Sequence, residues 1–225
     1  MEINVARVFV NKNSQFGNPV GIVLDEGHTL NDGERQKTST KLGFSETVFI
    51  DSLEAIPEVS IYNPQHMVKF AGHAVLGTVY FIQHILGKNI DSIKCSDESV
   101  KILLDGDVTY IKAPLSIMPA WNFERLDSPS EVVELTDEKI IQLRHTFIWS
   151  WINEKEGTVR ARTFAPDWGI PEDQANGSGS MKLASQLNKN LIITHGLGSV
   201  IYARPSGSEF AEVGGLVKIM NKITL

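Results

Sequence analysis

The sequence contains a single cysteine, Cys95, among 225 residues. A disulfide framework and a cysteine-rich zinc site are therefore excluded, because each needs several thiols. Histidine is also scarce, and the spacing of His66 and His73 fits no familiar metal-ligand pattern. We therefore expect no metal site.

Long runs of one residue type are absent as well. No apolar run reaches membrane-spanning length, no block of lysine or arginine stands out, and the formal net charge is −6. The first residues, Met1–Val5, lack the basic start and apolar core of a signal peptide. We expect a cytoplasmic protein with neither duplex nucleic acid nor a membrane as partner.

Nucleotide-binding and hydrolase motifs are missing too. Gly177-Ser178-Gly179 lacks the third glycine of a dinucleotide fingerprint and follows a proline-containing loop. There is no phosphate loop with its lysine, no paired-histidine zinc helix and no Gly-x-Ser-x-Gly elbow. The sequence therefore predicts no cofactor. Its length suits one broad domain or two lobes of roughly 110 residues each.

The stretch from Arg162 to Ala184 carries the strongest local pattern. Alternation predicts a strand that ends at Ala165, prolines and Gly169 then break it, and a helix follows the glycine turn 176–180. Glycines at a helix start let a ligand approach unpaired N–H groups, and the helix dipole favours an anion there. Glu172 and Asp173 lie just before this turn, where a carboxylate could cap the helix or move a proton.

The first half of the chain repeats this pattern. Tyr62-Asn63-Pro64 parallels Phe164-Ala165-Pro166, and each triplet leads to a turn of small residues that opens a helix; in the first half this turn is 70–74. Two such units indicate a duplicated fold in which both helix starts face a shared cleft. The alternative is a pair of ordinary capped helix ends.

Other elements follow from alternation and capping signals. Asn31-Asp32 predicts a helix that runs to Leu42 and stops at Gly43. Residues 131–145 are helix-like, with Thr136 as a possible cap. Proline-punctuated residues 113–119 suggest a lobe boundary, which gives an N-terminal lobe 1–115 and a C-terminal lobe 116–225. Strands are expected at 5–10, 20–24, 44–50, 59–62, 90–94, 100–104, 108–112, 147–151, 159–165, 191–194, 199–203 and 210–219.

Glu46 is the most informative single residue outside the two glycine turns. Strand alternation places it on one face with Phe44, Val48 and Ile50. A carboxylate in an apolar row is partly desolvated, which raises its pKa and suits it to proton transfer near neutral pH. The alternative is an edge-strand glutamate that points to solvent, because strand faces are easily misjudged by one residue.

Two further polar residues are candidates for the same site. His73 falls in the first turn of the predicted helix, where the dipole lowers its pKa and favours the neutral ring. Asn18 precedes a proline in a turn-rich loop and could offer its amide to a ligand. The alternatives are a packing histidine and an ordinary turn asparagine.

At this point the chain resembles a known family, the PhzF-type phenazine-biosynthesis-like isomerases, which are relatives of diaminopimelate epimerase. The resemblance covers nearly the whole chain. It rests on Phe16-Gly17-Asn18-Pro19, Gly43-Phe44-Ser45-Glu46-Thr47-Val48-Phe49, Phe70-Ala71-Gly72-His73-Ala74-Val75-Leu76-Gly77, Arg162 to Pro166, Glu172-Asp173 with Gly177-Ser178, and Val213-Gly214-Gly215.

The resemblance implies an α+β fold of two pseudo-symmetric lobes, each a curved, mostly antiparallel sheet around a central helix, with the active site between them. The epimerases carry a cysteine at each helix start; Gly72 and Gly177 stand at or near those places, which excludes a two-thiol mechanism. PhzF-like enzymes use the glutamate of the Ser-Glu-Thr motif, which matches Glu46. The resemblance further implies contacts with substrate for His73, Asp173, Ser178, Asn18, Gly72 and Gly177.

The chain departs from the family pattern at several positions. Met67 replaces a usual glutamate, Lys69 a usual proline, and Gly179 a usual alanine. Gln174 and Asn176 replace a usual proline and threonine. The second lobe is also short, because nothing between residues 119 and 159 matches the opening hairpin of the first lobe.

The sequence thus predicts a cofactor-independent isomerase that moves a proton within a small carboxylate-bearing substrate. Glu46, His73 and Asp173 are the catalytic candidates; Asn18, Gly72, Gly177 and Ser178 are the binding candidates. Family habit suggests a homodimer. One alternative is a non-catalytic small-acid binding or dimer-scaffold protein with the same fold. The other is an amino-acid racemase, which the missing cysteines disfavour.

Overall fold

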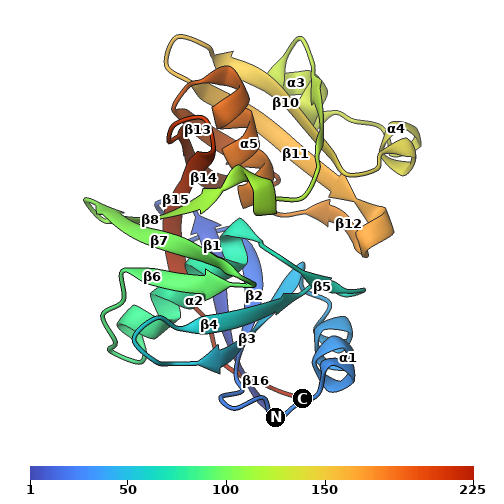
Figure 1. The fold of residues 1–225 in the computed structure, drawn as a ribbon. Coiled ribbons are helices and arrows are strands. Elements are labelled where there is room, and N and C mark those ends of the chain that lie inside the picture. Colours follow the sequence, from blue (N-terminus) through green and yellow to red (C-terminus); the bar gives the residue numbers. More distant parts are fainter.

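A computed structural model describes all residues, 1–225, as an α+β protein of two lobes. Figure 1 shows the first lobe below the second, with strand β15 (Phe210–Ile219) between them. This strand pairs with β8 and β1 on the first-lobe side and with β14 on the second-lobe side. The two lobes are therefore parts of one continuous sheet.

The first lobe is a closed barrel of eight strands. Closure comes from β1, which pairs with both β2 and β15. The β2–β3 and β4–β6 pairs are parallel, whereas the other neighbours are antiparallel. In order around the barrel the strands are β1 (Glu2–Val10), β2 (Asn18–Leu24), β3 (Glu46–Ser52), β4 (Glu58–Tyr62), β6 (Ser92–Cys95), β7 (Glu98–Asp105), β8 (Val108–Pro114) and β15.

Helix α2 (Gly72–His84) runs through this barrel, and ten of its thirteen residues are buried. Its sequence is apolar on almost every side, which is typical of a helix that protein surrounds completely. Gly77 allows a close approach to the wall, because a Cβ atom there would lie 2.8 Å from side-chain atoms of Val8 and Val20. This close contact fixes the position of the helix start along the barrel axis.

The second lobe is an open sheet around helix α5 (Gly177–Leu187), which packs on β14 and β15. From β15 the sheet continues through β14 and ends at β9 without closing. The expected shortening of this lobe is thus confirmed. Its further strands are β14 (Ser199–Pro205), β13 (Leu191–His195), β11 (Thr158–Ala165), β10 (Thr146–Asn153) and β9 (Asn122–Arg125), and β12 (Ile170–Asp173) is added on β11.

Short elements complete the chain around this continuous sheet. Strand β5 (Met67–Val68) pairs with β4, and β16 (Ile223–Thr224) pairs with β1. Helix α1 lies against β3 and β4 of the first lobe. The bounds of the helical elements are α1 (Asp32–Leu42), η1 (Leu115–Ile117), α3 (Pro129–Val133), α4 (Asp137–Gln142) and η2 (Pro166–Trp168).

Several local predictions are confirmed and one is wrong. Asn31 caps α1 in a capping box with Glu34, and Gly43 ends that helix with a φ of 66°. The helix-like stretch 131–145 is instead two short helices, because Thr136 caps a new helix, α4, three residues after α3 ends. Strands β5, β9, β12 and β16 are short and lack clear alternation, and the sequence did not predict them.

The C-terminal strands cross back to the first lobe. Residues 210–219 form β15 of the first barrel, and β16 pairs with β1, although both lie in the segment expected to form the C-terminal lobe. A division at residue 115 therefore does not assign every strand to its lobe. The boundary itself stays a prediction.

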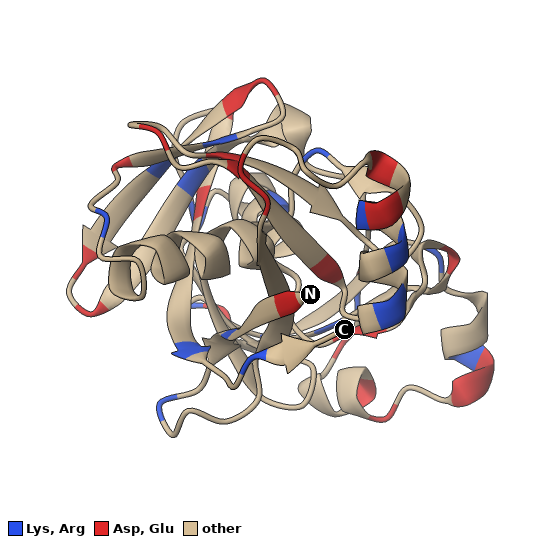
Figure 2. Ribbon diagram, turned by 90° about the horizontal axis from the view of Figure 1, so that it is seen from below, with Lys and Arg blue, Asp and Glu red and all other residues tan.

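Charged residues are spread over the molecule. In Figure 2 acidic and basic residues are interspersed, and the helix near the chain termini carries both signs. No helix is both long and apolar enough to cross a bilayer.

Candidate active site

The two central helices begin against each other. A Cβ atom on Gly72 would lie 3.2 Å from Cα of Gly177, and one on Gly177 would lie 3.1 Å from Cα of Gly72 and 3.2 Å from the backbone nitrogen of His73. Only glycine at both positions permits this approach without displacement of backbone. The shared location that the repeated sequence pattern predicted is therefore present.

Both helix starts present backbone N–H groups to this location. Ala71, the N-cap of α2, makes no side-chain capping bond, and the first turns of α2 and α5 contain no acidic residue. Asn176 caps α5 by accepting the N–H of Gly179 at 2.6 Å, which leaves the N–H groups of Gly177 and Ser178 without a capping side chain. Two helix dipoles therefore favour negative charge at one point.

A small cavity, which we call the helix-start cavity, lies between these two helix ends. Its volume is about 20 Å³, enough for roughly one water molecule. It includes six of the seven candidate residues, and only Asn18 is missing. The lining residues are Glu46, Asn63, Val68, Phe70, Ala71, Gly72, His73, Pro119, Trp121, Trp168, Ile170, Asp173, Asn176, Gly177 and Ser178.

Glu46 points into this cavity from the first residue of β3. Its side chain is 12% exposed, and its Oε2 lies 3.2 Å from Nε2 of His73. The two atoms are poorly aligned for a hydrogen bond, and neither has another polar partner. Burial raises the pKa of Glu46 well above its usual value, and the negative charge of Asp173 adds to the rise. Of the two alternatives for this residue, the structure favours the desolvated carboxylate.

His73 is buried in the first turn of α2. Burial lowers its pKa to about 3, and a hydrogen bond to the backbone carbonyl of Pro19 offsets part of that effect. The sequence predicted the direction of this change but attributed it to the helix dipole, whereas burial is the larger cause. A neutral ring has one donor and one acceptor nitrogen, so it can exchange a proton with the adjacent Glu46 carboxyl group.

Asp173 ends β12 and is buried beside the second helix start. Its carboxylate accepts hydrogen bonds from Nδ2 of Asn18 at 2.6 Å, from Nδ2 of Asn176 at 2.9 Å and from the backbone of Ala175 at 3.1 Å. Burial raises its pKa to about 6, and these hydrogen bonds oppose the rise. Asp173 does not cap α5; it orients the side chain of Asn176, which does.

The neighbouring acid, Glu172, has a different role. It forms a two-pronged ion pair with Arg162 at 2.8 and 2.9 Å, and it does not line the cavity. Of the two adjacent acids that the sequence singled out, Asp173 alone faces the helix-start cavity.

Asn18 is fully buried at the start of β2, behind Asp173. Its Nδ2 donates to Asp173 and, at 3.1 Å, to the carbonyl of Ala175, while its Oδ1 accepts from Ser45 at 3.4 Å. The amide is therefore engaged by protein groups and connects the two lobes. The expected contact of Asn18 with substrate stays a prediction.

Two cavity residues were missed by the sequence reasoning. Trp121 donates its indole N–H to Oγ of Ser178 at 3.0 Å, and the rings of Trp121 and Trp168 meet edge to face with centroids 5.2 Å apart. Trp168 lies in the loop that follows the repeated triplet, so its position offered a weak signal. Trp121 is 57 residues from Ser178 in the sequence, and no local pattern links them.

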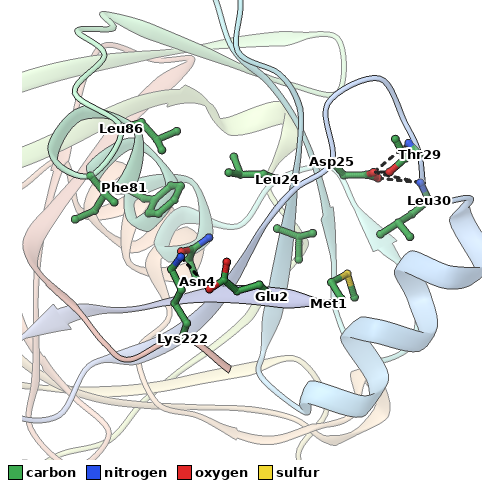
Figure 3. A pocket seen from close by; sticks show the side chains of 12 residues that line it. Met1, Glu2, Asn4, Leu24, Asp25, Thr29, Leu30, Phe81, Leu86 and Lys222 are labelled. Atoms are coloured by element: carbon green, nitrogen blue, oxygen red, sulfur yellow. Dashed lines mark hydrogen bonds and ion pairs between the residues drawn. The ribbon is translucent and has the colours of Figure 1, made fainter. Parts of the chain in front are cut away.

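A larger hollow than the helix-start cavity lies elsewhere, at the end of the first barrel near both chain termini (Figure 3). Its volume is about 490 Å³. Its charged groups are already paired: Glu2 binds Lys222 at 3.0 Å, and Asp25 accepts hydrogen bonds from Thr29 and the backbone of Leu30. This hollow therefore offers no free acid or base.

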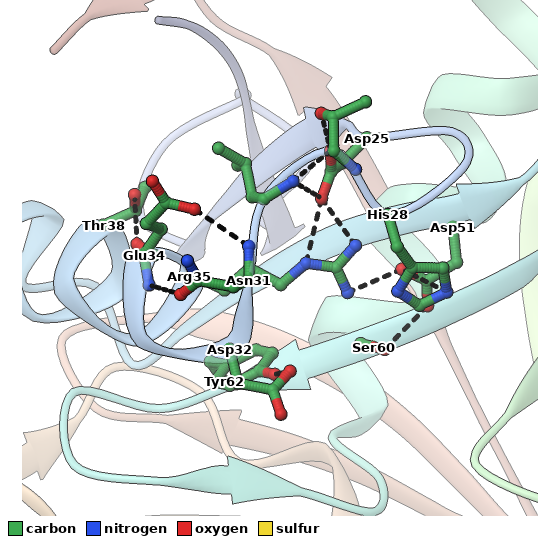
Figure 4. Close-up of polar contacts among 12 residues, drawn as sticks. Asp25, His28, Asn31, Asp32, Glu34, Arg35, Thr38, Asp51, Ser60 and Tyr62 are labelled. Atoms are coloured by element: carbon green, nitrogen blue, oxygen red, sulfur yellow. Dashed lines mark hydrogen bonds and ion pairs between the residues drawn. The ribbon is translucent and has the colours of Figure 1, made fainter.

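A second polar cluster lies beneath helix α1 (Figure 4). Arg35 is fully buried, and its guanidinium group binds Asp25 at 2.5 and 2.9 Å and Asp51 at 2.7 Å. Ser60 donates to the other oxygen of Asp51 at 2.6 Å. A single guanidinium group thus bridges two buried carboxylates, and this attaches α1 to the barrel. No group of three or more metal-ligating side chains occurs in the structure.

Comparison with known proteins gives a consistent result. Residues 7–112 match the family described as phenazine biosynthesis-like protein (PhzC-PhzF). An uncharacterized isomerase of Vibrio cholerae is 25% identical over 85% of this chain and 76% of its own length. An uncharacterized isomerase of Bacillus subtilis is 35% identical over 65 residues, which are 28% of this chain but only 22% of that protein.

A solved structure extends the likeness over the whole chain. The phenazine biosynthesis protein PhzF family member of Enterococcus faecalis has a TM-score of 0.77 at 17% identity, with 98% of this chain and 97% of that chain covered. At this low sequence identity, the structural likeness shows a shared fold only. Together with the sequence match over residues 7–112, it shows that this chain is similar in sequence to the phenazine biosynthesis-like (PhzC-PhzF) family over that range and shares the fold of a PhzF family protein over its whole length.

Proposed function

We propose that this protein is a cofactor-independent isomerase that shifts a proton within a small carboxylate-bearing substrate. Glu46 carries the proton, and the starts of α2 and α5 bind the carboxylate and stabilise the charge that develops on it. The observation that supports this most directly is a buried acid beside two converging sets of helix N–H groups. Its relatives in Vibrio cholerae and Bacillus subtilis are also described as isomerases.

The chemistry needs a base of raised pKa and donors for an enolate-like intermediate. A desolvated carboxylate is a stronger base than one in water, because burial disfavours its charged form. When Glu46 removes a proton from carbon, negative charge moves onto the substrate carboxylate, where N–H groups of Gly72, Gly177 and Ser178 can receive it. Glu46 then returns the proton to a different carbon, and its own charge state is restored.

His73 and Asp173 support this transfer from opposite helix starts. His73 is neutral and lies within reach of Glu46, so it can orient the carboxyl group or relay its proton. Asp173 holds negative charge near Glu46, which raises the pKa of Glu46 further and favours proton uptake. Asn18 and Asn176 support the proposal by holding Asp173 in place.

The proposal is tested by hydrogen–deuterium exchange at carbon. Small unsaturated cyclic and acyclic acids are incubated with the protein in heavy water and followed by proton NMR. Glu46→Gln keeps the shape but cannot accept a proton, so exchange should fall by about 10²- to 10⁴-fold, the usual contribution of a general acid–base group. Glu58→Gln, which alters an exposed ion pair with Lys94, is the matched control.

Exchange that Glu46→Gln leaves unchanged would remove the proposed base. The alternative of a non-catalytic small-acid binding or scaffold protein would be favoured by a Glu46 that is exposed and remote from His73 and Asp173. The structure shows Glu46 buried and 3.2 Å from His73, so it does not favour that alternative. A homodimer stays a prediction from the family resemblance.

A further inference from the structure

The helix-start cavity is covered by two tryptophans of the second lobe. Trp121 precedes β9 and Trp168 ends η2, and both side chains are half-buried. Each lines the cavity together with Glu46 and His73. Because neither tryptophan has a role in the proton transfer described above, their presence at the site requires a separate explanation.

Trp168 is held firmly from several sides. The ring of His145 lies on it with centroids 3.9 Å apart and an interplanar angle of 32°, and Nε2 of His145 binds Asp167 at 2.5 Å. Gln65 of the first lobe, with its amide in the orientation that satisfies both partners, donates to the carbonyl of Asp167 and accepts the N–H of Gly169. Trp168 is therefore held in a fixed position in the lining of the cavity.

Trp121 is attached to the site in a different way. Its single polar contact is the hydrogen bond to Ser178, and the residue lies in an irregular segment between η1 and β9. The next residue, Asn122, is fixed by hydrogen bonds to the backbone of His145 and Arg144. The backbone is thus anchored, whereas rotation of the indole side chain requires the loss of one hydrogen bond and of its edge-to-face contact with Trp168.

The size of the cavity shows why such a rotation matters. About 20 Å³ is free, whereas a cavity of roughly 150 Å³ is one that binds benzene. A carboxylic acid larger than a water molecule cannot enter beside Glu46 while the indole is in place. Ser178, whose hydroxyl group accepts the indole N–H, is also one of the residues that present backbone N–H groups at the start of α5.

We propose that Trp121 is a specificity-determining residue that competes with the substrate: its indole occupies the substrate's place, is bound to Ser178 in the free protein, and turns away when an acid binds. This inference rests on the proposed function for the identity of the site. Affinity for an acid is then reduced by the free energy needed to release the indole, and the space it leaves beside Trp168 sets the size of the substrate.

Benzoate is a suitable probe, because it has a carboxylate and a flat ring and needs no turnover. Trp121→Phe removes the hydrogen bond to Ser178 and makes the ring smaller. Benzoate should then bind about fivefold more tightly than to the wild type in calorimetry, the factor that one ordinary net hydrogen bond represents. Trp151→Phe is the matched control, since Trp151 is half-buried and stacks edge to face on Trp149 away from the cavity.

The indole N–H signals provide a second measurement that does not depend on affinity. The chain has four tryptophans, and the signal lost in Trp121→Phe identifies that of Trp121. Benzoate should shift this signal in the wild type. In free Ser178→Ala the signal should already differ from its wild-type position, because the acceptor of the indole is gone.

An unmoved Trp121 signal at saturating benzoate would overturn the proposal, as would equal or weaker binding by Trp121→Phe. Absence of benzoate binding to both proteins would overturn it too, since the vacated space would then not hold an acid. None of these results bears on the loss of carbon exchange in Glu46→Gln, so the two proposals fail separately.

Discussion

The buried carboxyl group of Asp173 predicts a specific dependence of stability on pH. Its pKa is 3.8 in an unfolded chain and about 6 in the folded protein, with burial as the main cause. Between these two values the folded protein holds a proton that the unfolded chain has lost. The free energy of unfolding therefore falls as the pH rises from 3.8 to about 6, and is level with respect to this group outside that window.

The size of the effect follows from the same two values. At about 1.4 kcal/mol for each pH unit, the difference between 3.8 and about 6 corresponds to about 3 kcal/mol. Glu46 acts in the same direction from its usual value of 4.5 upward, because its pKa is also raised. The wild-type protein should thus lose stability from mildly acidic to neutral pH, the reverse of the behaviour of a salt-bridged acid.

Asp173→Asn removes this dependence with little change of shape. An asparagine oxygen can accept from Asn18 and Ala175, while its NH₂ group would face the Nδ2 donor of Asn176. A protonated Asp173 makes an equally unfavourable contact, because its O–H faces the Nδ2 donor of Asn176. The variant therefore imitates the protonated state at every pH, and it also removes the negative charge that raises the pKa of Glu46.

The assay is urea unfolding between pH 3.5 and 7. The loss of stability over this range should be about 3 kcal/mol smaller in Asp173→Asn than in the wild type. Asp107→Asn, in the exposed turn between β7 and β8, serves as the control and should reproduce the wild-type profile. Parallel profiles for Asp173→Asn and wild type would refute the claim that this acid is desolvated, and would weaken its role beside Glu46.

Two further substitutions test the arrangement of the helices. Gly177→Ala places a methyl group 3.1 Å from Cα of Gly72. The free energy of unfolding, measured in urea, should therefore fall by about 1–3 kcal/mol, and hydrogen–deuterium exchange at carbon should fall about 100-fold. Unchanged exchange would show that the close approach of the two helix starts is not needed. Arg35→Met leaves Asp25 and Asp51 buried without their partner, so the free energy of unfolding should fall by about 3–5 kcal/mol. Lys94→Met at an exposed ion pair should leave it nearly unchanged; equal losses in the two variants would contradict the burial argument.

Much of the local structure could be predicted because its causes are local. A capping box and a following glycine define α1, and an apolar sequence without a polar face defines the central helix α2. The repeated triplets correctly placed two helix starts together, since each precedes a short strand and a glycine turn. Glu46 and His73 were found by their places in a strand and a helix turn, and both lie at the site.

Other features depend on contacts between distant residues and left no local signal. Asn18 bonds to Asp173 across 155 residues, and Trp121 to Ser178 across 57. The separate helices α3 and α4 follow from their caps, Ser128 and Thr136; Thr136 was expected as a cap, but the break between two helices within 131–145 was not. The closing of the first barrel by β15 could not be predicted either, because the alternation within a strand does not reveal which strands it will pair with.

The shortening of the second lobe affects access to the helix-start cavity more than the positions of the groups proposed to move the proton. Asp173 is held by Asn18 from the first lobe and by its own neighbours Ala175 and Asn176. The adjoining turn is held in the same way, since the hydroxyl of Ser199 donates to the carbonyl of Gln174 and accepts the N–H of Gly17. None of these groups lies between residues 119 and 159, where the lobe is short.

That short segment contributes only Pro119 and Trp121 to the helix-start cavity. A chain that is abbreviated there can therefore keep its acids, its helix starts and the bonds between its lobes. The shortened segment changes only the residues that cover the cavity. Here these are Trp168, which is held by His145, and Trp121, which makes one hydrogen bond. Differences in substrate between this protein and its longer relatives should accordingly map to Trp121, because the residues that would move the proton are positioned independently of it.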